Sequence, residues 1–334
     1  MRVGKALMMR FARWSWLSPQ SAQAEPRPAP AEPRPAPAAK RLALPRRPKP
    51  APLDVDPRPL ILSRKGIVVS WAPKSACSHV AIWFFLKEGL LPAANYYHPW
   101  PHNFRVEVYY RSLTYKRLAA RLAASEGRGH TLLRIVRDPE RRMVSIFRHV
   151  CRHPVLRKDI DRKLGIDTGR DGLSLRQFDA FLTDETPVVP SRLNMHLCAQ
   201  RHPTWAMPFD RVVTINMDEV ALNPALNAFE ADLGIERTDF ARLPKLADIA
   251  TRHYAREAGY DGDGAIEDHR FLAAETDAFP KAALEASPLV REMARRHHGI
   301  DLAATRSGDS KGRLRFGAAA EPPLTAAPGG RRPA

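Results

Sequence analysis

The chain has 334 residues, of which 44% are hydrophobic, enough to bury the core of one large or two small domains. Its formal net charge of +17 raises nucleic acid or an anionic surface as a partner. However, residues 1–60 hold 12 Lys and Arg against 4 Asp and Glu, and residues 303–334 hold 6 against 2. The middle of the chain is therefore only mildly basic, which argues against a body that binds a specific nucleic acid.

The three cysteines exclude two further classes of protein. Cys77, Cys151 and Cys198 are odd in number and widely spaced, so they form neither a disulfide framework nor a metal-binding pattern. A reducing setting is the simplest inference, and we expect a cytoplasmic protein.

The two ends of the chain are predicted to be disordered tails. Residues 1–17 are too short and too often interrupted by arginine to span a bilayer, although weak contact with the inner membrane surface stays open. Residues 1–59 are basic and rich in Pro and Ala, and the heptapeptide Ala-Glu-Pro-Arg-Pro-Ala-Pro occurs twice in tandem there. Such proline density favours extended polyproline II over a fold. We place one folded domain at residues 60–302 and a second tail at residues 303–334.

The domain opens with a strand, a tight turn and a helix. Residues 67–71 form an apolar run that predicts a buried strand, a polar turn follows, and an amphipathic helix is expected from Ser78. This order presents backbone amides and the positive end of a helix dipole to an anion, and Lys74 adds a mobile charge. The turn is not a Walker A loop, because it contains no glycine and lacks G-x-x-x-x-G-K-[ST].

Strand and helix patterns alternate through the rest of the domain. We expect a loop at 91–110, a helix at 112–125, a strand at 130–136, a helix from Pro139 to about Cys151, a helix at 174–183, a strand at 211–216 and a helix capped by Asp218. This alternation predicts an α/β fold, a single three-layer domain with a central, mainly parallel sheet. Ligands bind beyond the carboxyl ends of such strands, where Lys74 and Arg137 fall.

The segment from Arg137 to Phe147 is a second candidate for anion binding. Arg137 leaves a strand end, where its guanidinium can fork onto a phosphate. Ser145 lies about two helical turns later and reaches the same anion only if the helix crosses it. Each residue also has a simpler explanation, because Arg137 and Asp138 could form a surface ion pair and Ser145 could be an ordinary helix serine.

Taken together, the two segments resemble the sulfotransferase superfamily that uses 3′-phosphoadenosine 5′-phosphosulfate, closest to its carbohydrate branch. The P-K-x-[AG]-x-[ST] loop of that family is matched by Pro73 to Ser78, and its R-D-P-x-x-R-x-x-S-x-[FY] pattern by Arg137 to Phe147. A weaker H-x-x-x-Q similarity runs from His196 to Gln200, without the usual Trp after His and Pro before Gln.

The resemblance implies a P-loop-like fold, a sulfuryl donor and an acceptor. It implies that the 5′-phosphosulfate is held by the loop Pro73, Lys74, Ser75, Ala76, Cys77 and Ser78, and that Arg137 and Ser145 bind the 3′-phosphate. Lys74 would also stabilise the leaving phosphate as the bond breaks. The acceptor is expected to be a hydroxyl on a glycan, a glycolipid or a small hydroxyl compound, and no metal is required.

An acceptor hydroxyl needs a base whose pKa lies near neutrality, which favours histidine. His98 and His102 are the first candidates, because they lie in an aromatic loop after the first helix, where the superfamily binds its acceptor. His149, four residues after Ser145, and His196 are further candidates. Aromatic and proline residues that merely pack a surface segment explain the same loop equally well.

Two other functions fit the sequence. A different nucleotide-dependent enzyme, such as a small-molecule kinase, would need Mg²⁺ ligands, and Asp138 is the nearest candidate. A catalytically silent protein could instead bind polyanions through its basic tails.

Overall fold

The computed structural model describes residues 52–183, 194–253, 256–302 and 305–310. The predicted tail segments 1–51 and 311–334, with the expected membrane contact, lie outside these residues. The fold extends past both expected boundaries, because Leu53 and Val55 are buried before residue 60 and a strand at Gly308–Asp309 follows residue 302. Within the described residues, every helix is too short or too polar to cross a lipid bilayer.

The central sheet has five strands and is mainly parallel, as predicted. Their order is β1 (Leu60–Leu62), β2 (Ile67–Trp71), β3 (Thr131–Val136), β4 (Arg211–Asn216) and β7 (Gly308–Asp309). Strands β2, β3 and β4 run parallel, whereas β1 and β7 add antiparallel edges. All of β2 is buried, as expected of a continuous apolar strand in a parallel sheet.

Helices make up most of the remaining described structure. They are α1 (Cys77–Lys87), α2 (Leu91–Tyr97), α3 (Pro101–Phe104), α4 (Leu113–Ser125), α5 (Pro139–Arg152), α6 (Pro154–Leu164), α7 (Thr168–Asp171), α8 (Leu175–Thr183), α9 (Leu222–Asp232), α10 (Pro244–His253), α11 (Lys281–Ala286) and α12 (Pro288–Leu302). Shorter elements are a π-helical turn η2 (Arg105–Tyr109), the 3₁₀ turns η1 (Pro52–Asp54), η3 (Pro203–Ala206), η4 (Phe240–Arg242) and η5 (Ala273–Asp277), and the paired strands β5 (Arg256–Glu257) and β6 (Ala278–Phe279).

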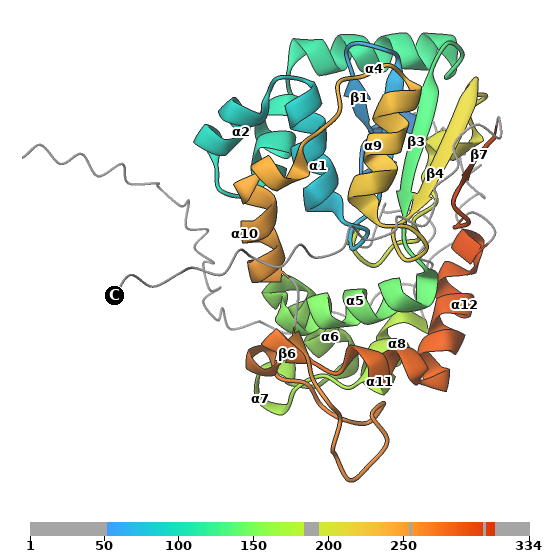
Figure 1. The fold of residues 1–334 in the computed structure, drawn as a ribbon. Helices are drawn as coiled ribbons and strands as arrows, with labels where there is room; N and C mark the ends of the chain where they lie inside the picture. The colour runs from blue at the N-terminus through green and yellow to red at the C-terminus, as the bar shows by residue number, and fades with distance from the viewer. Residues whose placement is uncertain (1–51, 184–193, 254–255, 303–304, 311–334) are drawn as a thin grey trace, which may run out of the picture. The chain divides into compact units, whose positions relative to one another are not determined.

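The apolar side chains form two hydrophobic cores. One core packs α1 and α9 against the sheet and includes Val68, Phe84 and Phe229. The other joins α5, α8 and α12, where Phe147 and Phe178 stack at 5.7 Å. In Figure 1 the second group of helices lies beyond the carboxyl ends of β3 and β4, with α5 crossing below them. The carboxyl ends of β3 and β4 therefore face a layer of helices.

Two expected elements differ from the structure. Residues 91–110, predicted to be a loop, form α2, α3 and η2, because Pro92 and Pro101 occupy first-turn positions where proline favours a helix. The helix expected from Asp218 begins at Leu222 with Ala221 as its N-cap, because the Asp218 side chain accepts a hydrogen bond from the Asp138 backbone instead. The other strands and helices predicted from the sequence lie within two residues of the expected positions.

Candidate functional site

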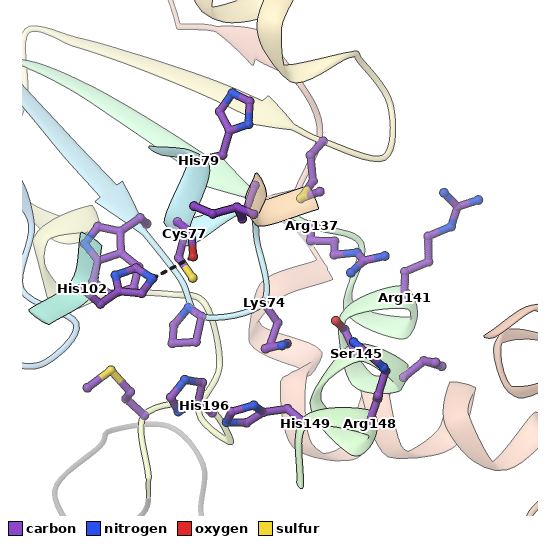
Figure 2. Close-up of a pocket in the computed structure, with 18 of the residues that line it drawn as sticks. Lys74, Cys77, His79, His102, Arg137, Arg141, Ser145, Arg148, His149 and His196 are labelled. Carbon is purple, nitrogen blue, oxygen red and sulfur yellow. Dashed lines mark hydrogen bonds between the residues drawn. The ribbon is translucent and has the colours of Figure 1, made fainter. Parts of the chain in front are cut away.

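A cavity of about 510 Å³ lies between the strand ends and α5. Lys74, Arg137 and Ser145 all line it, although they come from the β2–α1 turn, the β3–α5 turn and α5 itself. Figure 2 shows Lys74 pointing between His102 on one side and Ser145 on the other. Helix α5 crosses the strand ends, which is the arrangement that Ser145 requires to reach the same anion as Arg137.

The β2–α1 turn takes an unusual backbone shape without glycine. Lys74 and Ala76 have φ values of 69° and 53°, in the left-handed region that costs roughly 1–2 kcal/mol for a residue with a side chain. Ala76 is the N-cap of α1, and the first hydrogen bond of the helix runs from Val80 N to Ala76 O at 3.0 Å. The amides of the first turn therefore precede the helical ladder and are placed to bind an anion.

Two buried contacts from distant segments hold this turn in place. The Arg142 guanidinium donates from Nε to Pro73 O at 3.0 Å and from Nη2 to Cys198 O at 2.8 Å. The Ser75 hydroxyl donates to Gln200 Oε1 at 2.7 Å. Ser75 is fully buried and lies outside the cavity lining, so its side chain supports the turn while its neighbours line the cavity.

The β3–α5 turn is organised by local contacts. Pro139 occupies the first turn of α5, and the Asp138 carboxylate caps it by accepting from Glu140 N at 2.9 Å and Arg141 N at 3.2 Å. The predicted surface pair of Arg137 with Asp138 is replaced by an ion pair of Arg137 with Asp218 at 3.5 Å.

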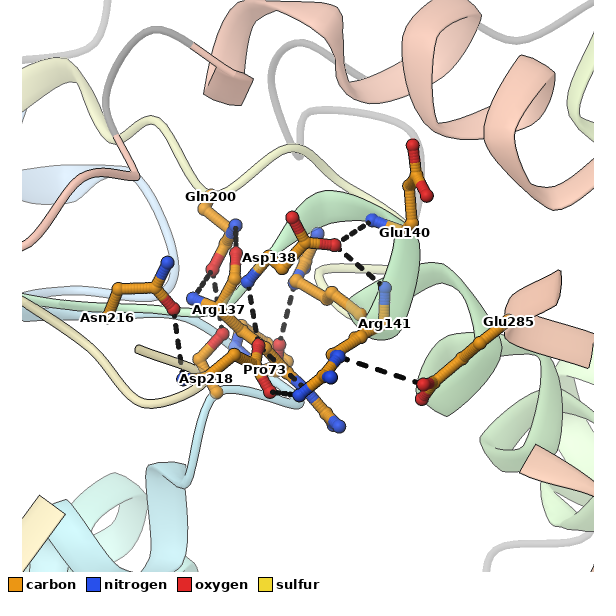
Figure 3. Close-up of polar contacts among 11 residues, drawn as sticks. Pro73, Arg137, Asp138, Glu140, Arg141, Gln200, Asn216, Asp218 and Glu285 are labelled. Carbon is orange, nitrogen blue, oxygen red and sulfur yellow. Dashed lines mark hydrogen bonds and ion pairs between the residues drawn. The ribbon is translucent and has the colours of Figure 1, made fainter. Parts of the chain in front are cut away.

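Asp218 fixes the direction of Arg137 (Figure 3). Its carboxylate accepts a hydrogen bond from Asp138 N at 2.8 Å and also pairs with Arg141 at 3.4 Å. Because Arg141 further contacts Glu285 at 3.7 Å, the guanidinium groups at this end of the cavity are held by carboxylates behind them. Arg137 is thereby presented to a ligand with part of its side chain already desolvated.

Gln200 joins the two turns through one buried side chain, also drawn in Figure 3. Its Oε1 accepts from Ser75 Oγ at 2.7 Å and from Arg137 N at 2.8 Å, while its Nε2 donates to Arg137 O at 2.7 Å. The Gln200 backbone N–H donates in turn to the Asp301 carboxylate at 2.8 Å. The glutamine of the weak H-x-x-x-Q similarity is therefore the brace between both anion-binding turns.

The cavity is strongly cationic at its centre. Burial, together with the charges of the nearby Arg148, Arg137 and Arg142, lowers the pKa of Lys74 to about 8. Burial and then the charge of Lys74 lower the pKa of His149 to about 2 and that of His196 to about 3. Both histidines are therefore neutral at pH 7, and a bound anion would favour protonation of all three groups.

Of the two histidines first expected as the base, His102 lines the cavity and His98 does not. The His98 Nδ1 atom accepts from Trp100 N at 2.8 Å. The His102 ring stacks on Trp71, its Nε2 lies 3.0 Å from Ser78 Oγ, and its Nδ1 lies 2.6 Å from Arg105 Nη1. A guanidinium only donates, so Nδ1 accepts, and a neutral His102 carries its proton on Nε2 and donates it to Ser78.

The sequence reasoning missed Arg105, Arg148 and Asp218. Arg105 and Arg148 line the cavity, and the Arg105 guanidinium lies 3.9 Å from the centre of the Trp71 ring. Asp218 follows the end of β4 by two residues, a position comparable to that of Asp138 after β3, and this spacing could have drawn attention to it. Arg105 had no such signal, because it lies far from any strand end in the chain.

The cavity lining also includes the apolar side chains of Met217 and Ile249 and the ring of His79. Within the described ranges, no group of three or more His, Cys, Asp or Glu side chains is arranged to hold a metal ion.

No protein-family model, curated protein sequence or solved structure matches this chain.

Proposed function

We propose that this protein is a sulfotransferase, which moves the sulfuryl group of 3′-phosphoadenosine 5′-phosphosulfate to an acceptor hydroxyl on a carbohydrate, a glycolipid or another small hydroxyl compound. The observation that supports this most is that Lys74 lines the same cavity as Arg137 and Ser145. Two anion-binding turns on neighbouring parallel strands fit a nucleotide that carries phosphate groups on both sides of its ribose.

Each end of the cavity has a part in this proposal. The turn from Pro73 to Ser78 offers backbone amides and the Lys74 ammonium to the 5′-phosphosulfate. Arg137, held by Asp218, and the Ser145 hydroxyl would bind the 3′-phosphate. The apolar surface of Met217 and Ile249 offers a wall for the nucleobase.

A protein accelerates sulfuryl transfer, like phosphoryl transfer, in two ways. It aligns the nucleophile with the leaving group, and it stabilises the negative charge that develops on the leaving phosphate. Lys74 suits the second task, because its ammonium can follow the oxygen that becomes part of the leaving phosphate. By analogy with a lost oxyanion contact, this is worth roughly 3–4 kcal/mol of transition-state stabilisation.

Isothermal calorimetry with two nucleotides tests the proposal. Adenosine 3′,5′-bisphosphate should bind at least about tenfold more tightly than adenosine 5′-monophosphate, since one charge-assisted contact contributes about 1.5–3 kcal/mol. Arg137→Ala and Ser145→Ala should each reduce that preference, whereas the exposed Arg128→Ala in the α4–β3 turn should leave it unchanged. Equal and weak binding of both nucleotides would contradict the 3′-phosphate site.

A transfer screen with labelled sulfate over glycans, glycolipids and small phenols then identifies the acceptor. In calorimetry, binding that requires Mg²⁺ and prefers ATP would indicate a kinase instead. Deleting residues 1–51, which leaves the buried Leu53 and Val55 in place, tests the polyanion-binding alternative. Loss of all polyanion binding without any transfer by the intact chain would favour that alternative.

A further inference from the structure

His196 has a fixed proton position. The Asn194 Oδ1 atom accepts a hydrogen bond from the His196 backbone N–H at 3.0 Å and lies 2.6 Å from His196 Nδ1. Because the backbone donor identifies this end of the amide as oxygen, Nδ1 must be the donor to it. A neutral His196 therefore carries its proton on Nδ1, and its Nε2 atom is unprotonated.

Two other histidines of the cavity have the reverse arrangement. In His102 the Arg105 guanidinium faces Nδ1, and in His153 the Leu156 backbone N–H donates to Nδ1 at 3.3 Å. Both neutral rings therefore carry their proton on Nε2. For His102 to accept a proton at Nε2, its ring would become an imidazolium whose Nδ1–H faces the Arg105 donor, which is unfavourable. Among these three rings, His196 has the tautomer suited to accept a proton at Nε2.

His196 also lies in a suitable place. It lines the same cavity as Lys74, and its ring lies against that of His149 at a tilt of 31°, with 4.2 Å between the ring centres. Figure 2 shows His196 beside Lys74 on the side of the cavity away from Arg137 and Arg141. This is the side left for an acceptor if Arg137 holds the 3′-phosphate.

We propose that His196 is the general base of the transfer and that Asn194 is its positioning residue, an inference that rests on the proposed function. His196 Nε2 takes the proton of the acceptor hydroxyl while its oxygen forms a bond to sulfur. The bond between sulfur and the bridging oxygen breaks, and its electron pair remains on that oxygen beside Lys74. The products are the sulfate ester, adenosine 3′,5′-bisphosphate and a protonated His196, which then releases its proton to solvent.

The charges around His196 agree with this role. Burial is the main cause that lowers the pKa of His196, and the positive charges of Lys74, Arg142 and Arg105 lower it further, so the ring is neutral at pH 7. The negative charges of a bound donor oppose these cations, which raises the pKa of His196 towards the working range of a base.

Two measurements on the full chain test the assignment. His196→Ala should lower turnover in the labelled-sulfate assay by at least 100-fold, while the affinity for adenosine 3′,5′-bisphosphate in calorimetry changes by less than about threefold. His269→Ala, at an exposed histidine outside the cavity lining, is the matched control and should retain turnover. The acceptor is the compound that gives the fastest transfer in the screen described above.

Asn194 is tested by rescue. Asn194→Ala should lower kcat about tenfold with an unchanged KM for the donor. Asn194→Asp should restore kcat and move the acidic limb of its pH profile to higher pH, because a carboxylate stabilises protonated His196. If Asn194 served folding alone, its variants would neither shift the pH profile of kcat nor lower kcat at an unchanged KM.

Three results would overturn the assignment. Turnover of His196→Ala within threefold of the wild type would show that another group is the base. A loss of turnover that parallels a loss of adenosine 3′,5′-bisphosphate binding would place His196 in the donor site instead. A wild-type chain that shows no preference for the 3′-phosphate would contradict the proposed function itself, and that result is read before any His196 variant is assayed.

Discussion

The two turns that line the cavity are shaped by different forces. The helix start in the β3–α5 turn is set by its own residues, since Pro139 and the Asp138 cap lie beside Arg137 in the chain, and Gln200 and Asp218 then bind the backbone of this turn from distant segments. The β2–α1 turn places Lys74 and Ala76 in the left-handed region and depends on Arg142 and Gln200, which lie far away in sequence. A locally encoded turn forms with its helix, whereas the other requires the whole domain to be folded.

The difference between the turns extends to their cations. The planar guanidinium of Arg137 can donate two parallel hydrogen bonds, which suits a phosphate that stays in place. Lys74 is a compact charge with a depressed pKa on a flexible stem, which suits an oxygen whose charge changes during the reaction. The comparison supports the proposal that the β3–α5 turn binds the donor and the β2–α1 turn contributes to the chemistry.

Removing the reactive cation should have the largest effect. Lys74→Ala is expected to lower kcat by roughly 10²–10³, because one preorganised charge-stabilising contact is lost in the transition state. The exposed Lys116→Ala on α4 is the matched control and should retain full turnover. Labelled-sulfate transfer measures both variants, and a fully active Lys74→Ala would remove the β2–α1 turn from the chemistry.

Breaking the brace should have the next largest effect. Gln200→Leu leaves the Arg137 backbone groups and the Ser75 hydroxyl without their partner, and should weaken adenosine 3′,5′-bisphosphate binding by about 10- to 100-fold. Asp138→Ala, which removes only the local cap, should lower the free energy of unfolding by about 1 kcal/mol and change binding less.

The brace is distinguished from general destabilisation by a double variant. Because Ser75 and Gln200 share a hydrogen bond, adding Ser75→Ala to Gln200→Leu should cost little further affinity. Calorimetry gives the binding constants, and chemical denaturation gives the free energies of unfolding. Equal losses of affinity in Gln200→Leu and Asp138→Ala would contradict the distinction between the two turns.

The pH dependence should come from the β2–α1 turn. The pKa of Lys74 is lowered to about 8, so its ammonium is present below pH 8 and is lost above it. In the free enzyme, kcat/KM for the donor should therefore fall about tenfold per pH unit above pH 8. Lys74→Arg should abolish this alkaline limb, because a guanidinium stays protonated. An unchanged limb in that variant would assign it to another group.

The smallest effect is expected from relieving the backbone of the first turn. Ala76→Gly removes the penalty of a left-handed alanine but adds freedom to the unfolded chain, so it should raise the free energy of unfolding by about 0.5–1 kcal/mol. The reverse change, Gly165→Ala at the C-cap of α6, has the same left-handed φ with open space around it and should cost about 1 kcal/mol. Urea denaturation compares them, and a destabilised Ala76→Gly would argue against strain at Ala76.

Much of the sheet and the positions of the two turns that line the cavity could be predicted from the sequence. Apolar runs such as Ile67–Trp71 are recognisable because parallel strands are buried on both faces, and Pro139 with Asp138 is a local helix start. For the same reason Lys74 and Arg137 were expected at the carboxyl edge of one sheet, and both line one cavity.

Only the tertiary structure decided which distant groups complete the site. The sequence around Lys74 does not indicate that Gln200 contacts its turn, and the sequence around Arg137 does not indicate that Asp218 contacts the other turn. These contacts join segments more than 60 residues apart. The tautomers of His102 and His196 were likewise undecidable from sequence, since a hydrogen-bond partner in space sets where each ring carries its proton. The sequence alone determined that Lys74 and Arg137 lie at one edge of the sheet. Folding determined how these side chains are oriented and which nitrogen of each histidine is protonated.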